Sequence, residues 1–145
     1  RRIAKYLNGY FAIARSIKEW NKTEKNLKEK ICSAAEKKYG SKREFLWQRS
    51  DNSVLRRGDN KKWYAVFMHI PRSKLGLPSD EPVDIIDIKC DPMMSGSLRS
   101  SEGYFPAYHM NKSNWITVIL DGIVPLEDIL ALLDISYTLA AGKKR

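Results

Sequence analysis

The 145-residue sequence has little of what would place it among secreted or membrane proteins. Its only two cysteines, Cys32 and Cys90, lie in unrelated contexts, which argues against a disulfide framework and fits a reducing setting. No apolar run approaches the roughly 20 residues that a membrane span needs, and no secretory signal pattern opens the chain. We therefore predict a single cytoplasmic domain with no membrane partner.

The common catalytic and metal-binding motifs are also missing. The sequence contains no C-x-x-C, no H-E-x-x-H, no glycine-rich phosphate loop and no G-x-S-x-G. The two histidines, His69 and His109, stand far apart in the sequence, without the dense acidic partners that a zinc site needs. We therefore expect no catalytic residue, metal or cofactor. A nucleophilic pair of Cys90 and His109 stays open, because such partners meet in space rather than in sequence.

Positive charge, by contrast, is abundant and unevenly placed. The chain has 26 Lys and Arg against 17 Asp and Glu, a net charge of +9. Residues 1–43 hold 13 of the cations and only 4 of the acids, so the whole excess lies in the N-terminal third. This distribution favours a polyanionic partner, most simply nucleic acid. A solvated helical surface explains the same lysines, and composition alone slightly favours that simpler explanation.

Apolar residues at helical spacing predict helices at both ends of the chain. The first covers residues 2–20, and the second begins after Thr23 and ends at Gly40. A final helix is predicted from Pro125, in the first helical position, to Gly142. Residues 143–145 then form a basic tail.

Between the helices the period changes to that of strands. We expect strands at Ser53–Arg57, Lys61–Ile70, Val83–Cys90 and Trp115–Leu120, and a short helix after Asp91-Pro92. In the second strand the alternation places Trp63, Ala65 and Phe67 on one face, and Tyr64, Val66 and Met68 on the other. The order of elements predicts an α+β fold, an antiparallel sheet of four to five strands covered by N- and C-terminal helices.

The first two strands form a predicted hairpin around the turn Gly58-Asp59-Asn60. Four cations flank this turn: Arg56, Arg57, Lys61 and Lys62. They suit contacts with nucleic-acid phosphates. They suit equally well the charges that keep a sheet edge from pairing with other chains.

A second candidate site is the stretch G-Y-F-P-A-Y-H-M-N-K-S-N-W, residues 103–115, which leads into the last strand. His109, Asn111 and Lys112 offer a titratable ring, an amide that can pair with an adenine edge, and a cation. The neighbouring aromatic rings can stack on bases. Alternatively, Asn111 caps a turn, His109 satisfies backbone groups and the aromatics belong to the core.

Several segments together resemble the MmcQ/YjbR family. They are L-W-Q-R-S-D-N-S-V-L-R-R-G-D-N-K-K-W-Y-A-V, V-D-I-I-D-I-K-C-D-P, P-A-Y-H-M-N-K-S-N-W-I-T-V-I-L-D-G and L-L-D-I-S-Y-T-L. The resemblance runs from about Glu24 to Leu139, which places a YjbR-like domain at residues 21–142 and leaves residues 1–20 outside it. It implies a sheet covered by helices, similar to frataxin and secretion chaperones, and DNA binding through a "double wing" of hairpins. It also implies that Lys89 lies near the His109 loop.

These observations predict a non-enzymatic DNA-binding module, with double-stranded DNA as the partner. Its contacts are expected to come from the basic N-terminal helices and from eight residues: Arg56, Arg57, Lys61, Lys62, Lys89, His109, Asn111 and Lys112. A protein-interaction or chaperone-like domain is the first alternative. A small-ligand binder or enzyme centred on the His109 loop is the second.

Overall fold

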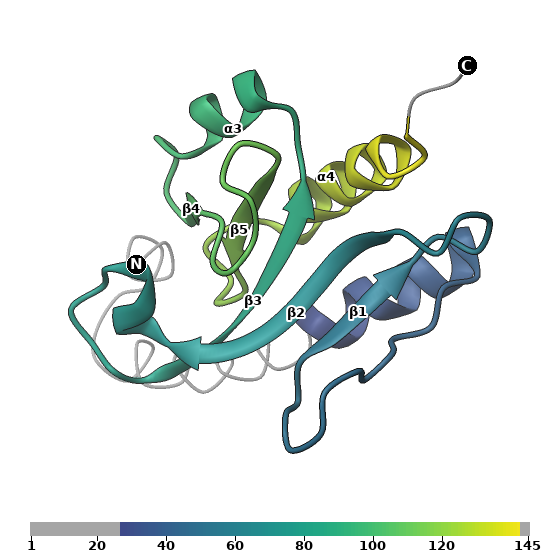
Figure 1. The fold of residues 1–145 in the computed structure, drawn as a ribbon. Helices are drawn as coiled ribbons and strands as arrows, with labels where there is room; N and C mark the ends of the chain where they lie inside the picture. Colours follow the sequence, from purple (N-terminus) through teal and green to yellow (C-terminus); the bar gives the residue numbers. More distant parts are fainter. Residues whose placement is uncertain (1–26, 143–145) are drawn as a thin grey trace, which may run out of the picture.

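The computed structural model describes residues 27–142. Residues 27–39 are helical. The later elements are β1 (Ser53–Arg56), β2 (Trp63–Pro71), η1 (Arg72–Leu75), β3 (Pro82–Lys89), α3 (Pro92–Leu98), β4 (Tyr104–Pro106), β5 (Trp115–Ile119) and α4 (Leu126–Leu139) (Figure 1). This order confirms the predicted α+β class. The predicted helix over residues 2–20 and the basic tail lie outside the described residues.

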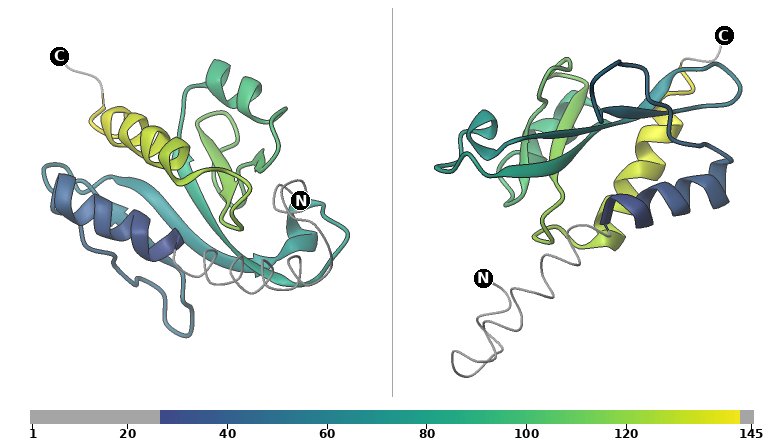
Figure 2. Two further views of the ribbon diagram at one scale, coloured as in Figure 1. Left: turned by 180° about the vertical axis from the view of Figure 1, so that it is seen from behind. Right: turned by 90° about the horizontal axis from the view of Figure 1, so that it is seen from below.

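The five strands form one antiparallel sheet in the order β1-β2-β3-β5-β4. Helix 27–39 and α4 lie on the same side of this sheet (Figure 2). Among the described residues, no α-helix packs on the opposite side. We call the two sides the helix-covered face and the helix-free face. No helix within residues 27–142 has both the length and the apolar character to cross a lipid bilayer.

The helix-covered face is a closely filled core. Its strand residues include Phe67, Ile86, Ile88, Ile116 and Val118, and its helix residues include Leu27, Ile31, Ile129 and Leu133. Most of these side chains are completely buried. Each fully buried aliphatic side chain contributes roughly 1.5–3 kcal/mol through the hydrophobic effect. This core therefore fixes the helices on the sheet.

An irregularity in strand pairing changes the predicted faces of β2. Leu55 pairs with Ala65, but the next residue of β1, Arg56, pairs with Trp63, so Tyr64 is an extra residue on β2. Tyr64 consequently packs in the helix-covered core, and Trp63 packs with the helix-free face. The prediction from strict alternation was wrong for these two residues, because a bulge reverses the side-chain directions beyond it.

Three further details differ from the sequence predictions or refine them. Pro125 caps α4, and the helix begins one residue later, at Leu126. Asp91 caps α3 by accepting a hydrogen bond from the backbone nitrogen of Met94 at 2.8 Å. The expected loop after residue 103 contains a short edge strand, β4, paired with β5.

Gly103 explains why β4 can lie where it does. This glycine has φ +94°, and an added Cβ would stand 2.5 Å from the Cγ2 atom of Val124. Any side chain at this position meets both a strained backbone and a buried neighbour. The glycine thus permits the close approach that places β4 at the sheet edge.

The helix-free face buries a second apolar cluster. It contains Val54, Val66, Met68, Ile85, Trp115 and Ile119, with Trp63, Phe105, Tyr108 and Met110 packed against it. The last two belong to the segment between β4 and β5. This face is therefore covered by loop residues, which fill the space above a sheet less completely than helices do.

Candidate functional site

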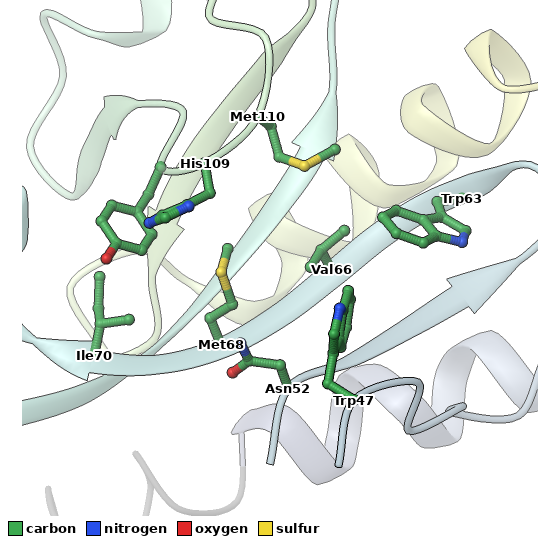
Figure 3. A pocket seen from close by; sticks show the side chains of 9 residues that line it. Trp47, Asn52, Trp63, Val66, Met68, Ile70, His109 and Met110 are labelled. Atoms are coloured by element: carbon green, nitrogen blue, oxygen red, sulfur yellow. The ribbon is translucent and has the colours of Figure 1, made fainter. Parts of the chain in front are cut away.

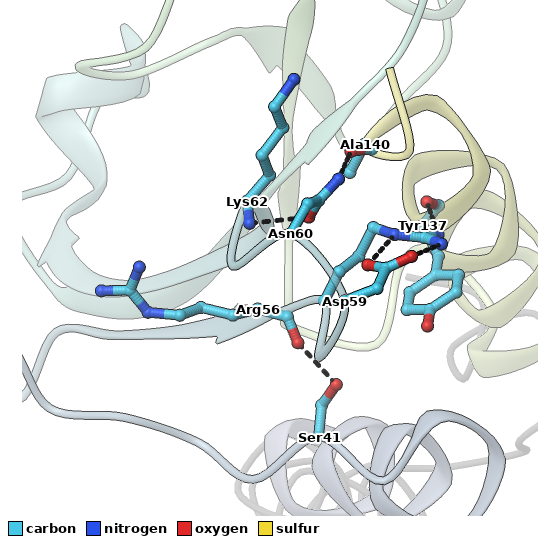
Figure 4. Close-up of polar contacts among 8 residues, drawn as sticks. Ser41, Arg56, Asp59, Asn60, Lys62, Tyr137 and Ala140 are labelled. Atoms are coloured by element: carbon cyan, nitrogen blue, oxygen red, sulfur yellow. Dashed lines mark hydrogen bonds and ion pairs between the residues drawn. The ribbon is translucent and has the colours of Figure 1, made fainter. Parts of the chain in front are cut away.

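The turn between β1 and β2 is held to α4 by Arg57. Its guanidinium donates two hydrogen bonds to the carboxylate of Asp59, at 2.9 and 2.8 Å, and one to the backbone oxygen of Tyr137 at 2.7 Å. It also lies 4.0 Å from the centre of the Tyr137 ring (Figure 4). The hydrogen bond from Arg57 lowers the pKa of the Asp59 carboxyl. Arg57 therefore anchors the turn and has little capacity left for a ligand.

The neighbouring residues reinforce this anchor. Asn60 donates to the backbone oxygen of Ala140 at 2.9 Å and accepts from the backbone nitrogen of Lys62 at 2.9 Å (Figure 4). Arg56 contacts Glu44 at 3.3 Å and donates to the backbone oxygen of Lys61 at 3.1 Å. The turn is thus a rigid platform whose conformation does not depend on a partner.

Lys61, Lys62 and Lys89 are different, because no carboxylate among residues 27–142 pairs with any of them. Lys61 and Lys62 are exposed, and Lys89 is half-buried, with its Nζ atom 5.4 Å from the centre of the Trp115 ring. Burial lowers the pKa of Lys89, and the nearby charge of Lys62 lowers it further. Two like charges are therefore held close together without compensation, at a cost to stability.

We call Lys42, Arg56, Arg57, Lys61, Lys62 and Lys89 the tip cluster. Four of them, with Glu44, line a hollow of about 160 Å³ beside the turn: Lys42, Arg56, Arg57 and Lys61. The cluster sets six cations against two contacting carboxylates, Glu44 and Asp59. The other residues between 27 and 142 hold 10 Lys and Arg against 13 Asp and Glu. The tip cluster with its two contacting carboxylates therefore carries a net charge of +4, whereas the other described residues sum to −3.

The described lysines of the N-terminal region contribute less to this field. Lys38 pairs with Asp134 at 2.6 Å, and Lys28 approaches Asp84 at 3.5 Å. The remainder of the basic N-terminal third lies outside the described residues. Contact between the basic N-terminal helices and DNA stays a prediction.

The loop between β4 and β5 uses two of its predicted site residues for its own fold. The side-chain oxygen of Asn111 accepts from the backbone nitrogen of Ser113 at 2.8 Å, which is the turn-capping alternative. Lys112 donates to the backbone oxygen of Ala107 at 2.9 Å. His109 stays exposed, with φ +62°, in the left-handed region that residues other than glycine rarely adopt.

Beneath this loop lies a buried carboxyl group that the sequence reading did not single out. Asp87 is fully buried, and the hydroxyl of Thr117 donates to it at 2.5 Å while accepting from the backbone nitrogen of Tyr108 at 2.9 Å. The other carboxyl oxygen has no hydrogen-bond partner. Burial raises the pKa of Asp87 to about 7, against the opposing effects of the Thr117 hydrogen bond and the charge of Lys112.

A cavity of about 390 Å³ opens on the helix-free face, between this loop and the segment before β1. Val66, Met68 and Ile70 of β2 form its floor. Trp47, Trp63, Tyr108 and His109 contribute aromatic rings, and Asn52 and Met110 complete the lining (Figure 3). The loop thus presents His109 to a concave, mostly apolar site.

The structure therefore divides the eight predicted residues into two groups. Five belong to the tip cluster, namely Arg56, Arg57, Lys61, Lys62 and Lys89, and three lie on the loop between β4 and β5. The Cys90 side chain packs in the helix-covered core, where burial raises the pKa of its thiol, whereas His109 lines the cavity on the helix-free face. Within residues 27–142, no three His, Cys, Asp or Glu side chains are arranged to hold a metal ion.

Sequence reasoning missed Lys42, Trp47, Asn52 and Asp87. A signal existed for Asp87, which shares its strand parity with Val83 and Ile85 and so stands on an apolar face. For Trp47 and Asn52 the sequence holds no such signal, because the cavity joins three segments that are distant along the chain. Only the folded arrangement brings them together.

Comparison with known proteins gives a consistent result. The YjbR family model matches residues 36–139. The chain is 36% identical over 113 residues to the uncharacterized protein YyaQ of Bacillus subtilis, covering 77% of this chain and 96% of that protein. A crystal structure of a Pseudomonas syringae protein aligns with a TM-score of 0.75 at 43% identity, covering 77% of this chain and 97% of that one. A Deinococcus radiodurans protein aligns with a TM-score of 0.58 at 28% identity, covering 79% and 75% of the two chains.

Proposed function

This chain belongs to the YjbR family, and we propose that it is a DNA-binding module whose phosphate contacts come from the tip cluster. The observation that carries the proposal is the uncompensated lysine group formed by Lys61, Lys62 and Lys89. Folding holds Lys62 close enough to Lys89 to lower the pKa of Lys89, and no described carboxylate relieves the repulsion. A phosphate group placed between the two ammonium groups would relieve it.

The charge distribution supports the same partner. The described residues together are nearly neutral. The tip cluster is positively charged, and the other described residues carry a net negative charge. Such a dipolar arrangement orients the protein toward a polyanion and favours contact through one end. DNA offers a regular row of phosphates to that end, and the counterions it releases provide the free energy of binding.

The residues in and around the tip cluster have two kinds of role: some hold the turn in place, and others are proposed to contact DNA. Arg57 and Asn60 hold the turn against α4, so their side chains position the lysines. Lys61, Lys62 and Lys89 have ammonium groups that no carboxylate within residues 27–142 pairs with, and they are the proposed phosphate contacts. Roles in DNA binding for His109, Asn111 and Lys112 stay predictions, because two of these side chains have partners in their own loop.

The proposal is tested by the double variant Lys61→Gln/Lys62→Gln, measured by fluorescence anisotropy with a mixed-sequence duplex at several salt concentrations. Loss of two phosphate contacts should weaken binding on the order of tenfold and reduce the salt slope by about two. The loss should be nearly equal for unrelated sequences, because phosphate contacts do not read bases.

The single variant Lys62→Gln removes one positive charge from the tip cluster. Its matched control is Lys74→Gln, which removes one positive charge from η1, at the opposite end of β2 (Figure 1). This variant should bind DNA as the unmodified chain does. Equal weakening by both substitutions would mean that only net charge matters, and unchanged binding by the double variant would exclude the tip cluster as the contact.

One observation favours the alternative of a protein-interaction domain. Phe45, Leu46 and Trp47 are consecutive apolar residues with 56%, 41% and 40% of their surface exposed. Exposed apolar groups of this kind are typical of docking surfaces. The variant Phe45→Ser/Leu46→Ser separates the two proposals, since it should leave DNA affinity unchanged while abolishing association with a protein partner.

A further inference from the structure

The cavity on the helix-free face has the lining of a site for a flat ring. The indoles of Trp47 and Trp63 meet edge to face, with ring centres 5.8 Å apart and planes at 74°. The rings of Tyr108 and His109 bound the other side, above the floor formed by β2. A volume of about 390 Å³ falls within the range of small-molecule sites. Aromatic walls favour planar ligands, because ring contacts add to the area that is buried.

Besides the indole N–H groups and the Tyr108 hydroxyl, two polar side chains of this lining form no hydrogen bond with another described residue. They are Asn52, whose amide carries both a donor and an acceptor, and the imidazole of His109 (Figure 3). Asn52 uses only its backbone nitrogen, which donates to the hydroxyl of Ser50 at 3.0 Å. Within residues 27–142, no Asp, Glu, Lys or Arg lines the cavity. The lining therefore suits an uncharged ligand edge that offers an acceptor and a donor side by side.

The backbone of His109 supplies an independent indication. Its φ of +62° is unfavourable for a side chain with a Cβ, and glycine or asparagine would adopt it at lower cost. Residues held in such conformations gather at ligand sites, where the surrounding structure maintains the strain. Here the strained residue is the one that turns an imidazole toward the cavity.

We propose that this cavity binds a planar heteroaromatic ring of the purine class, with the Asn52 amide pairing with its polar edge. The amide of asparagine pairs with the amino group and the ring nitrogen of adenine through two hydrogen bonds. A purine in a duplex is stacked on both sides and cannot enter, so this site goes beyond duplex binding. A free purine nucleoside and an unpaired purine in a single strand share the required chemistry.

The experiment is an NMR titration of the ¹⁵N-labelled full chain, with adenosine in one arm and a short oligo(dA) strand in the other. Saturable shifts are expected at the indole N–H signals of Trp47 and Trp63 and at His109. Shifts in both arms, or in either one, identify the source of the ring and support the site. The absence of saturable shifts at these residues with both probes, up to the solubility of adenosine, would overturn it.

The role of Asn52 is tested by comparing adenosine with purine riboside, which lacks the 6-amino group. The unmodified chain should prefer adenosine by about fivefold to tenfold, the value of the one hydrogen bond that the 6-amino group donates. In Asn52→Ala this preference should disappear, with the backbone spectrum unchanged because the lost side chain had no described partner. A preference that persists in Asn52→Ala would overturn the assigned contact.

The control variant is Lys62→Gln, which should leave adenosine affinity unchanged while weakening duplex binding. In the unmodified chain, absence of duplex binding together with saturable adenosine binding would contradict the tip cluster alone. The reverse result would contradict the cavity alone. The two proposals are therefore separable in one set of proteins.

Discussion

The two faces of the sheet differ in what they bury. The helix-covered face holds closely packed apolar side chains. Of its buried hydroxyls, that of Ser136 has two partners, whereas that of Tyr64 has none among the described residues. The helix-free face holds a carboxyl oxygen of Asp87 without a partner, a left-handed His109 and an open cavity. Unfavourable features persist in a folded protein only where the rest of the structure compensates for them. The two faces therefore differ mainly in that the first is filled by helices, whereas the second keeps an open cavity beside a strained residue.

Matched substitutions in the two cores should have the largest effects. Ile86 is fully buried on the helix-covered face, whereas Ile70 borders the cavity on the other. Ile86→Ala should lower the free energy of unfolding by about 4 kcal/mol, and Ile70→Ala by about 2 kcal/mol, because a side chain beside open space loses fewer contacts. Denaturant unfolding measures both values. Equal losses would mean that the two faces are packed equally well.

A hydrogen-bond prediction sharpens the same comparison. The hydroxyl of Ser136 donates to the backbone oxygen of Tyr64 at 2.6 Å and accepts from the backbone nitrogen of Lys89 at 2.8 Å, joining α4 to two strands. Ser136→Ala leaves two buried groups unpaired and should cost about 2–3 kcal/mol in the free energy of unfolding. The control Thr138→Ala, on the exposed side of α4, should cost less than about 0.5 kcal/mol. A small loss for Ser136→Ala would show that water or a local shift replaces the hydroxyl.

The buried carboxyl predicts a pH-dependent difference in stability. Because the pKa of Asp87 is raised to about 7 in the folded chain, both folded and unfolded states hold its proton at the most acidic pH, and the group then has no effect. From about pH 4 to about pH 7 the unfolded chain releases the proton and the folded chain keeps it. The free energy of unfolding therefore falls as the pH rises through this window, and the penalty is constant above it.

Asp87→Asn removes this titration. The variant should be more stable than the unmodified chain at pH 8, by on the order of 2 kcal/mol, and the advantage should vanish toward pH 4. Unfolding measured for both proteins at each pH gives the difference, in which other titrating groups cancel. Parallel stability profiles would contradict a neutral Asp87 in the folded chain.

The sequence predicts those features of the fold that depend on residues near one another in the chain. Within residues 27–142, the helices, the longer strands and the turn after Arg57 follow from periodicity and turn residues, and their predicted order was confirmed. Strict alternation failed at Tyr64, because a bulge depends on the partner strand. The three residues of β4 are too few to show a period. The sequence also does not predict the pairing of Arg57 with Asp59. It shows four cations near the turn, but not which of them form ion pairs within the protein.

The smallest predicted effect concerns the lysine pair itself. Replacing Lys62 by glutamine removes the charge that contributes to lowering the pKa of Lys89, so the pKa of Lys89 should rise toward its ordinary value. NMR titration of the Lys89 side chain measures this, with Lys74→Gln as the control that should cause no change. An unchanged pKa would mean that the two ammonium groups lie too far apart to share one phosphate.

The most direct test of the account is an NMR titration of the ¹⁵N-labelled chain with a mixed-sequence DNA duplex at low salt. Counterion-driven binding through the tip cluster predicts shifts concentrated at Lys61, Lys62 and Lys89 that fade as salt is added. The signals of Lys74 and of Glu127 and Asp128, in the first turn of α4, should stay unchanged. Shifts centred on η1 or α4, or none at all within residues 27–142, would contradict the proposal that this end of the sheet is the DNA contact.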